Sequence, residues 1–286
     1  MSDVYILGSL NMDLAIESDR APFEGETIAG KNFRTCPGGK GLNQAIAASK
    51  LGAHVKMLGA IGNDSFGKEM KEALIINKVD VTHIKTIDNV SSGIAIIQLI
   101  NKDNRIILDL GANLNLAKKD VDSFLKTAKQ DDIFLTQLEN DVDIVGYALK
   151  TAKSKGMTTI LNPAPANKKI VKYLQFVDII TPNETECDSL GEDKVLSANH
   201  VIKTLGKHGY KYISKDTEFS QEPIKVDVVD TTGAGDAFSG ALAYILSIDK
   251  ALNKKALDFA SKAASISVTR KGTSVASPTL DEVINF

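Results

Sequence analysis

The residues 226–240, VDVVDTTGAGDAFSG, have the composition of an anion-binding turn with a carboxylate inside it. The pattern predicts an apolar strand up to Asp230, a glycine-rich turn and a helix over 237–246. In such a turn the backbone N–H groups converge, and the helix N-terminus adds partial positive charge, so phosphate oxygens could bind. Asp236 is either a first-turn residue that interacts with the helix dipole or a general base beside a transferring phosphoryl group.

A second glycine-rich stretch, CPGGKGLN at 36–43, precedes another predicted helix. It is not a P-loop, because Arg34 stands where the Walker pattern needs glycine and Gly41 where it needs serine or threonine. The stretch is either a solvated turn with a surface lysine or a place where the backbone approaches a hydroxylated ligand, with Lys40 near negative charge. The spacing GxGxxG is also missing from 233–240, which argues against a dehydrogenase.

The sequence TPNETE at 181–186 follows a predicted strand and places Asn183 and Glu186 at helical spacing. Asn183 either caps the helix or contacts phosphates, and in the second case Glu186 would hold waters of a magnesium ion. The four histidines show no pairing at ligand spacing and no GxSxG occurs, so nothing indicates a metalloprotease or a serine hydrolase.

Strand and helix signals alternate along the chain, which predicts a mainly parallel sheet with helices on both faces. The first predicted strand, 4–10, runs directly into Asn11 and Asp13, at the kind of strand end where open α/β sheets bind ligands. The other predicted strands are 55–61, 132–138, 158–161 and 177–181. Helices are predicted at 42–51, 64–77 and 121–129.

Two segments interrupt this alternation. Residues 16–35 have few helix signals, and residues 93–109 form two apolar runs about the turn Lys102-Asp103-Asn104, which is typical of a β-hairpin. Together they predict a small sheet that projects as a lid, formed by about 14–35 and 93–110. No linker or repeat divides the chain, so we expect a single domain over 1–286.

Composition excludes several classes of protein. The chain has 286 residues with 34 basic and 36 acidic side chains, so no global field attracts nucleic acid or an anionic membrane. Cys36 and Cys187 lack metal-ligand spacing and are expected to be reduced thiols. The N-terminus has neither a basic n-region nor a long apolar run, and we therefore expect a cytoplasmic protein without membrane or nucleic-acid partners.

Six spaced motifs resemble one family over nearly the whole length, in the family's order. They are GSLNMD at 8–13, PGGKGLN at 37–43, GAN at 111–113, PNETE at 182–186, TLG at 204–206 and DTTGAGD at 230–236. The chain resembles the ribokinase-like (PfkB) family of carbohydrate kinases. The resemblance implies an α/β fold, a Rossmann-type three-layer α/β/α sandwich with a small β-sheet lid. Asn11 with Asp13, and VTRKG at 268–272, match the branch that uses ATP to phosphorylate the 5-hydroxyl of D-ribose.

Site residues follow from the resemblance position by position. The sugar hydroxyls would be held by Asn11, Asp13, Gly39, Lys40, Asn43 and Glu139. Asp236 would be the base, and charge on the phosphoryl group would be neutralised by the backbone of Gly233, Ala234 and Gly235. The nucleotide would lie along Asn183, Thr204, Gly206, Gly209, Gly235 and Ser261. Glu186 would bind Mg²⁺ through water, and an activating K⁺ would be bound by Asp230, Thr232, Ser267, Arg270 and Gly272.

The chain departs from the family pattern at two places. Between Asn183 and Thr204 it is about one helix shorter, which leaves room for a single crossover helix. Near the end, Ala276 stands where these kinases often have a cation-contacting serine, and Ser277 comes one position later.

Other functions stay open at this point. The substrate could be deoxyribose, fructose, a ketodeoxy sugar acid or a nucleoside, or the chain could be a non-catalytic sugar-binding sensor. A sensor would not need the intact base Asp236 together with Gly233, Gly235 and Lys40. The apolar faces of the hairpin further predict a homodimer formed through the lid.

Overall fold

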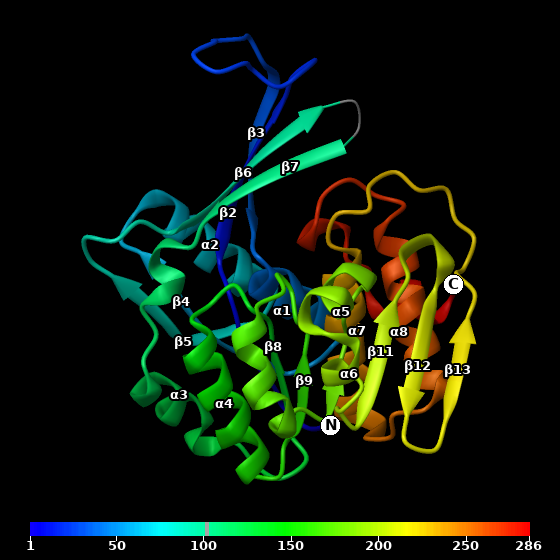
Figure 1. Ribbon diagram of the computed structural model, residues 1–286. Coiled ribbons are helices and arrows are strands. Elements are labelled where there is room, and N and C mark those ends of the chain that lie inside the picture. The colour runs from blue at the N-terminus through cyan, green and yellow to red at the C-terminus, as the bar shows by residue number, and fades with distance from the viewer. Residues whose placement is uncertain (101–102) are drawn as a thin grey trace.

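The computed structural model describes residues 1–100 and 103–286, and its centre is a nine-stranded sheet (Figure 1). From one edge to the other the strands are β13 (Glu218–Gln221), β12 (Tyr210–Ser214), β11 (His200–Thr204), β10 (Ile179–Ile180), β9 (Thr158–Leu161), β8 (Ile133–Thr136), β1 (Val4–Leu7), β4 (Val55–Gly62) and β5 (Asp80–Ile87). The pairs from β11 to β5 are parallel, and β12 and β13 pair antiparallel at one edge. The prediction of a mainly parallel sheet is confirmed.

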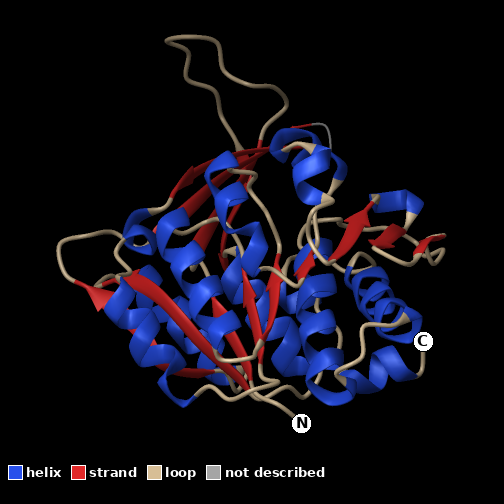
Figure 2. Ribbon diagram, turned by 60° about the horizontal axis from the view of Figure 1, so that its bottom comes forward, coloured by secondary structure: helices blue, strands red, loops and turns tan. Residues whose placement is uncertain are grey.

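Helices cover both faces of this sheet (Figure 2). Side chains alternate along β1, so Val4 and Ile6 belong to one hydrophobic core and Tyr5 and Leu7 to the other. The first layer contains α1 (Lys40–Lys50), α2 (Ser65–Ile76), α7 (Ala234–Asp249), α8 (Lys254–Ser267) and α9 (Leu280–Ile284). The second contains α3 (Lys118–Phe124), α4 (Val142–Ser154), η3 (Lys168–Phe176), α5 (Glu184–Leu190) and α6 (Glu192–Val195). The three-layer α/β/α sandwich is thereby confirmed.

None of the helices in the described part of the chain combines the length and the apolar composition needed to cross a membrane.

A separate four-stranded sheet projects from the sandwich (Figure 1). Its order is β3 (Lys31–Gly38), β2 (Asn11–Glu17), β6 (Gly93–Ile100) and β7 (Asp103–Asp109). Strands β2 and β6 pair in parallel, whereas β2 with β3 and β6 with β7 are antiparallel. The small sheet expected from the two interrupting segments is present, and its action as a lid stays a prediction.

The structure corrects two strand predictions. The first strand ends at Leu7, and Asn11 and Asp13 belong to β2 of the small sheet rather than to the end of a central strand. Residues 226–230 are not a strand, because they have no neighbouring strand to pair with and instead Val229 and Asp230 donate their N–H groups to the carbonyl of Val268.

Two further boundaries differ from the predictions. Of the proposed hairpin turn, Lys102 lies outside the described residues, whereas Asp103 and Asn104 already pair with β6. The shortened segment before Thr204 contains two short helices, α5 and α6, rather than a single crossover helix. They are separated at Gly191, whose φ of 92° no continuous helix can accommodate.

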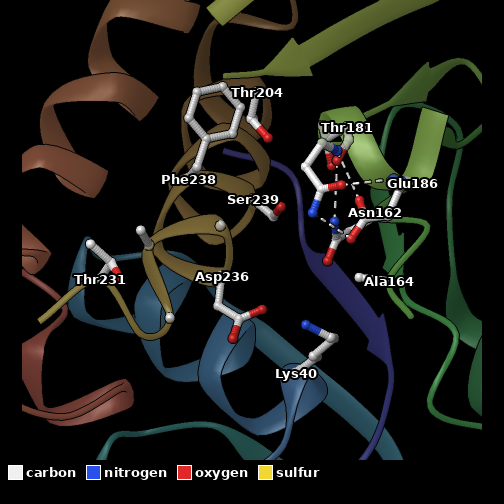
Figure 3. A pocket seen from close by; sticks show the side chains of 14 residues that line it. Lys40, Asn162, Ala164, Thr181, Glu186, Thr204, Thr231, Asp236, Phe238 and Ser239 are labelled. Carbon is white, nitrogen blue, oxygen red and sulfur yellow. Dashed lines mark hydrogen bonds between the residues drawn. The ribbon is translucent and has the colours of Figure 1, made fainter. Parts of the chain in front are cut away.

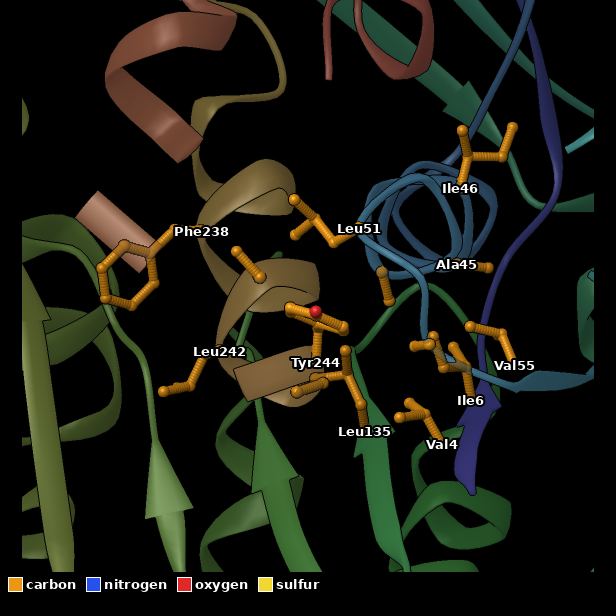
Figure 4. Packing of buried hydrophobic residues seen from close by; sticks show 14 of the residues in the cluster. Val4, Ile6, Ala45, Ile46, Leu51, Val55, Leu135, Phe238, Leu242 and Tyr244 are labelled. Atoms are coloured by element: carbon orange, nitrogen blue, oxygen red, sulfur yellow. The ribbon is translucent and has the colours of Figure 1, made fainter. Parts of the chain in front are cut away.

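Helices α1 and α7 approach each other closely at Gly240 of α7. A Cβ atom at this position would lie 2.7 Å from both the Ala47 Cβ and the Gln44 carbonyl oxygen of α1. On the side towards the sheet, Leu242 and Tyr244 of α7 share the first core with strand β1 (Figure 4). Because nothing larger than glycine fits between the two helices, the first turn of α7 is brought against α1.

Candidate active site

Asp236 lies in the first turn of α7, because this helix begins at Ala234 and not at 237 as predicted. The carboxylate is buried, with 8% of the residue exposed. Its Oδ2 accepts a hydrogen bond from Asn43 Nδ2 at 3.0 Å and its Oδ1 accepts one from Gln44 Nε2 at 2.9 Å. Burial raises the pKa of Asp236, against the opposing effects of Lys40 and of the two amides.

Glu139 accepts hydrogen bonds from two segments, residues 9–11 and the start of α1. Its Oε2 accepts hydrogen bonds from Ser9 Oγ at 2.5 Å, Asn11 Nδ2 at 3.2 Å and the Lys40 backbone N–H at 3.2 Å. Asn113 in turn donates to Asn11 Oδ1 at 2.8 Å. This network orients Asn11 and joins the start of β2 to the N-terminus of α1.

Asp13 lies on β2, against Gly38 of the paired strand β3. A Cβ at residue 38 would lie 2.4 Å from Asp13 Oδ2, so the glycine is required for the close approach of the carboxylate. Burial raises the pKa of Asp13 to about 7, and the negative charges of Glu139 and Asp236 contribute in the same direction. Asp13, Glu139 and Asp236 therefore form one electrostatically coupled group of carboxylates.

A cavity of about 190 Å³ opens beside Asp236 (Figure 3). Its lining contains Lys40, Asn162, Ala164, Thr181, Asn183, Glu186, Thr204, Thr231, Gly233, Ala234, Gly235, Asp236, Phe238 and Ser239. Burial lowers the pKa of Lys40, but the charges of Asp236, Glu139 and Glu186 outweigh it, so the net shift is upward. The structure thus brings three predicted parts of the site to one cavity: the base, the glycine-rich turn 230–235 (the anion turn) and part of the nucleotide site.

The anion turn has the expected form, with Gly233 in the left-handed region immediately before α7. The Ala234 N–H, which we expected to face a phosphoryl group, reaches the carbonyl of Thr231 at 3.3 Å. At Gly235 no described atom lies within 4 Å of where a Cβ would be, although the residue lines the cavity. Packing within the protein therefore does not require glycine at position 235. A ligand that approaches the backbone closely from the cavity would require it.

Asn183 and Glu186 form a capping box at the start of α5. Glu186 N–H donates to Asn183 Oδ1 at 2.8 Å, while the Glu186 carboxylate accepts from the Asn183 N–H at 2.9 Å and from Nδ2 at 3.0 Å. Burial raises the pKa of Glu186, whereas the Asn183 N–H and Lys40 lower it. The capping interpretation is therefore correct, and both side chains also line the cavity.

The residues predicted to bind a monovalent cation lie on two segments that are joined by Asp230. Its carboxylate accepts N–H groups from Thr232 at 2.9 Å and from Gly272 at 3.1 Å. Ser267 is the last residue of α8, and its hydroxyl donates to Ala264. The Arg270 guanidinium pairs with Glu282 at 2.5 Å. Because a guanidinium is positively charged and has no acceptor atom, only the backbone carbonyl of Arg270 could bind a cation.

Three residues predicted to line the nucleotide do not line the described cavity. Gly206 is the first residue of the turn η4 (Gly206–His208) between β11 and β12, Gly209 directly follows this turn, and Ser261 lies within α8. Their contacts with a nucleotide stay predictions.

Sequence reasoning missed several polar residues that support the site. Gln44 is the most informative of them: its Nε2 also reaches Asn162 Oδ1 at 3.2 Å, and its Oε1 accepts from Gln137 Nε2 at 2.7 Å. Gln44 follows Asn43 directly, and adjacent helical residues do not normally share a face. Both reach the same carboxylate because α7 packs so closely on α1. The other missed residues are Ser9, Asn113, Gln137 and Asn162.

The site joins three features: a buried carboxylate at the N-terminus of α7, polar groups suited to hydroxyls, and an adjoining cavity that extends to Asn183 and Thr204. An α/β sandwich with this arrangement is a phosphotransferase that acts on a hydroxylated substrate.

Comparison with known proteins identifies the family. Residues 1–280 match the model of the pfkB family carbohydrate kinases, and the chain belongs to this family. It is 37% identical over 297 residues to the ribokinase of Haemophilus influenzae, covering 98% of this chain and 97% of that protein. It is 34% identical over 300 residues to the deoxyribokinase of Salmonella typhimurium, with 98% and 97% coverage. The structure of Arabidopsis thaliana ribokinase complexed with ribose and ATP has a TM-score of 0.88 at 30% identity, covering 99% and 98%.

The raised pKa of Asp13 predicts that this residue destabilises the fold at neutral pH. Between about pH 4 and 7 the unfolded state loses the Asp13 proton while the folded state keeps it, so the free energy of unfolding falls as pH rises. Asp13→Asn cannot ionise. We expect it to be more stable than the wild type by about 1–3 kcal/mol near pH 8, and the difference to vanish near pH 4, in urea unfolding.

Asp64→Asn is the matched control with the opposite sign. Burial raises the pKa of Asp64, but hydrogen bonds from Ser92 and Gly67 lower it below its ordinary value. The ionised carboxylate therefore stabilises the fold at pH values above the ordinary pKa of an aspartate. Asp64→Asn removes this charge and should be less stable than the wild type near neutral pH. Equal stability of Asp13→Asn and wild type at both pH values would contradict the Asp13 prediction.

Proposed function

We propose that this chain transfers the terminal phosphoryl group of ATP to the 5-hydroxyl of D-ribose, forming ribose 5-phosphate and ADP. The observation that carries the proposal is the position of Asp236. This carboxylate is buried at the N-terminus of α7, held by two amides of α1, and faces the cavity that Gly233 and Gly235 also line.

The relatives support ribose as the substrate and offer 2-deoxyribose as a second candidate. The chain is an ATP-dependent sugar kinase of the pfkB family, and ribokinases are similar to it over nearly their full length. The similarity to a deoxyribokinase makes 2-deoxyribose the second candidate. A site that hydrogen-bonds the 2-hydroxyl would discriminate against deoxyribose, because its buried polar groups would be left unpaired.

Asp236 acts as the general base. It accepts the proton of the sugar hydroxyl as the oxygen attacks the phosphorus atom and the bond to the ADP oxygen breaks. The amides of Asn43 and Gln44 donate to both carboxylate oxygens, which favours the ionised form, while burial raises the pKa towards the pH at which a base works best.

The sugar is oriented by Asn11, Asp13 and Asn43. Asn43 Oδ1 is buried and has no hydrogen-bond partner among the described residues, so it can accept a sugar hydroxyl. Asn11 is held by Glu139 and Asn113, which leaves little freedom to its side chain. A pre-oriented set of acceptors and donors fixes the hydroxyl close to Asp236.

Negative charge that develops on the phosphoryl group is stabilised by the start of α7 and by Lys40. The first N–H groups of a helix have no partner within the helix, and those near Gly233 and Gly235 border the cavity. The Lys40 ammonium is directed into the same cavity from α1 (Figure 3).

Mg²⁺ fits this site as an ion held mainly by nucleotide phosphates and water. In the described parts of the chain no three His, Cys, Asp or Glu side chains are arranged so that they could hold a metal ion by themselves. Glu186 is an acidic residue that lines the cavity and has lone pairs left after capping. When bound, the ion would neutralise phosphate charge. Glu186 would then hold its waters, and Asn183 would contact the phosphates of the nucleotide.

Replacement of Asp236 by asparagine tests the proposal. Asn is nearly isosteric but cannot accept the proton, so Asp236→Asn should lower kcat by about 10²–10⁴-fold and change the KM for ATP little. The measurement is coupled release of ADP with ribose, 2-deoxyribose, fructose, a ketodeoxy sugar acid and a nucleoside. Ribose should give the highest kcat/KM in the wild type.

Asp249→Asn, at the other end of the same helix, is the control and should match the wild type. A variant at position 236 with half of the wild-type kcat would remove Asp236 as the base. Preference for deoxyribose would change the substrate but not the reaction, and absence of ADP release with every sugar would favour a binding protein.

We further propose that potassium activates the enzyme from the segments joined by Asp230. Carbonyl groups of Ser267, Arg270 and Gly272 would be its ligands, and the buried hydroxyl of Thr273, which lacks a partner in the described structure, supports a polar site there. An ion at this place would stabilise the anion turn without touching substrate.

Titration with K⁺ at constant ionic strength, balanced by a bulky organic cation, should raise kcat/KM for ribose. Ala276 supplies no hydroxyl, and a missing neutral contact is worth about 0.5–1.5 kcal/mol, so half-activation should need up to about tenfold more K⁺ than an intact site would. A flat response would exclude the ion from the mechanism.

We also propose that the small sheet is a lid and that two chains form a homodimer through it. Ile96 and Ile107 are direct partners on the face opposite Asp13, with exposed fractions of 44% and 70%, and Phe33 on β3 is 64% exposed.

The free thiols Cys36 and Cys187 fit a reducing compartment such as the cytoplasm.

Ile107→Lys should convert the dimer into monomers in sedimentation experiments, because it places a charge in the apolar interface. Ile76→Lys on α2, where the isoleucine is 72% exposed, is the matched control and should stay dimeric. A monomeric wild type, or a dimeric Ile107→Lys variant, would contradict this mode of association.

A further inference from the structure

Lys50, the last residue of α1, binds a loop near the C-terminus of the chain. Its Nζ donates to the backbone carbonyls of Ser274 at 3.0 Å, Val275 at 3.1 Å and Ser277 at 3.0 Å. Ser274 and Val275 belong to the short 3₁₀ helix η5 (Ser274–Ala276), and Ser277 directly follows it. All three donors of the ammonium are thus used on main-chain oxygens.

The three hydrogen bonds of Lys50 restrain the backbone of the loop. The Ser274 carbonyl also accepts the Ser277 N–H at 3.3 Å. The last carbonyls of a helical turn otherwise lack partners within the turn, and a cation is a favourable partner for them. Three contacts from one ammonium hold three peptide groups in a defined relation to each other and to α1. An exposed lysine without this function would remain mobile and solvated.

The loop bound by Lys50 packs against the anion turn. The Cα of Thr273 lies 3.2 Å from the position of a Cβ on Gly233, and one residue earlier the Gly272 N–H donates to Asp230. The loop is thereby in contact with both ends of the segment 230–233. A displacement of the loop would therefore disturb the segment that directly precedes the first N–H groups of α7.

The same helix α1 also holds Asp236 through Asn43 and Gln44. Contacts therefore lead from α1 through Lys50 to the loop 272–277, from this loop to the anion turn, and from the turn into α7. Helix α7 in turn contacts α1 through Asp236. Among the described residues, Lys50 is the only charged side chain whose hydrogen bonds join α1 to this loop.

We propose that Lys50 is a positioning residue for phosphoryl transfer, whose ammonium fixes the loop 272–277 and through it the anion turn. The inference rests on the proposed kinase function, and it adds a residue that contacts neither substrate. The side chain acts as a permanent internal cation among carbonyl oxygens, next to the segment in which Ala276 lacks a hydroxyl.

Lys50→Met tests this by keeping the apolar stem and removing the charge. Misplacement of the anion turn affects the transition state more than sugar binding, so kcat should fall about 10–100-fold while the KM for ribose changes less than about twofold. Lys50→Arg retains several N–H donors and should recover most of kcat.

Chemical rescue separates the charge from general structural damage. Ethylammonium chloride should raise kcat of Lys50→Ala, which leaves space beside the three carbonyls, and should leave Lys50→Met unchanged, because the methionine fills that space. Sodium chloride at equal ionic strength is the reference for both variants.

Hydrogen–deuterium exchange supplies a readout that does not depend on activity. In Lys50→Met without ligands, peptides that cover 229–236 and 268–279 should exchange faster than in the wild type, and peptides from α4 should not. Lys85→Met is the matched control, because Lys85 also donates to a backbone carbonyl, that of Asn115, but far from the anion turn. It should alter neither kcat nor exchange at 229–236.

Wild-type kcat and unchanged exchange in Lys50→Met would overturn the inference, as would equal rescue of both Lys50 variants by ethylammonium. If the wild type releases no ADP with any sugar, the proposed kinase function fails. The exchange experiment then still decides whether Lys50 holds the anion turn in place.

Discussion

The close contact between α1 and α7 at Gly240 is the constraint on which the site depends. At this contact a single Cβ would push apart the helix that carries Lys40, Asn43 and Gln44 and the helix that begins with the anion turn. The groups proposed to bind the sugar hydroxyls and those proposed to bind the phosphoryl group are thus on two elements whose distance is set by packing. A catalytic base can accept hydrogen bonds from one helix while it belongs to the other only because this distance is short.

The electrostatics of the site follow from this compactness. Asp13, Glu139 and Asp236 bring three acidic groups together, and burial adds to their mutual repulsion, so the pKa values of Asp13 and Asp236 are raised. Lys40 compensates part of this charge, and the amides of Asn43 and Gln44 satisfy the carboxylate of Asp236. A site of this kind costs stability in the absence of substrate, which is the usual relation between function and stability in enzymes.

The residues proposed to bind and activate the sugar come from both the small sheet and the sandwich. Asn11 and Asp13 belong to the small sheet, whereas Asn43 and Asp236 belong to the helices of the sandwich. Movement of the small sheet would therefore carry sugar-binding groups with it. If it closes on bound sugar, orientation of the hydroxyl and exclusion of water would occur in the same step, and this limits transfer of the phosphoryl group to water.

The sequence alone determined the alternation of strands and helices, the glycine-rich turn before Asp236 and the helical spacing of Asn183 and Glu186, because these depend on local periodicity and turn chemistry. It did not determine that Asn11 and Asp13 would leave the central sheet, since strand pairing is a long-range choice. Nor did it indicate that Gln44 contacts Asp236 or that Lys50 binds the carbonyls of 274–277. Those contacts join residues about 190 or 225 positions apart, and only the packing of α1 against α7 and of the C-terminal loop brings them together.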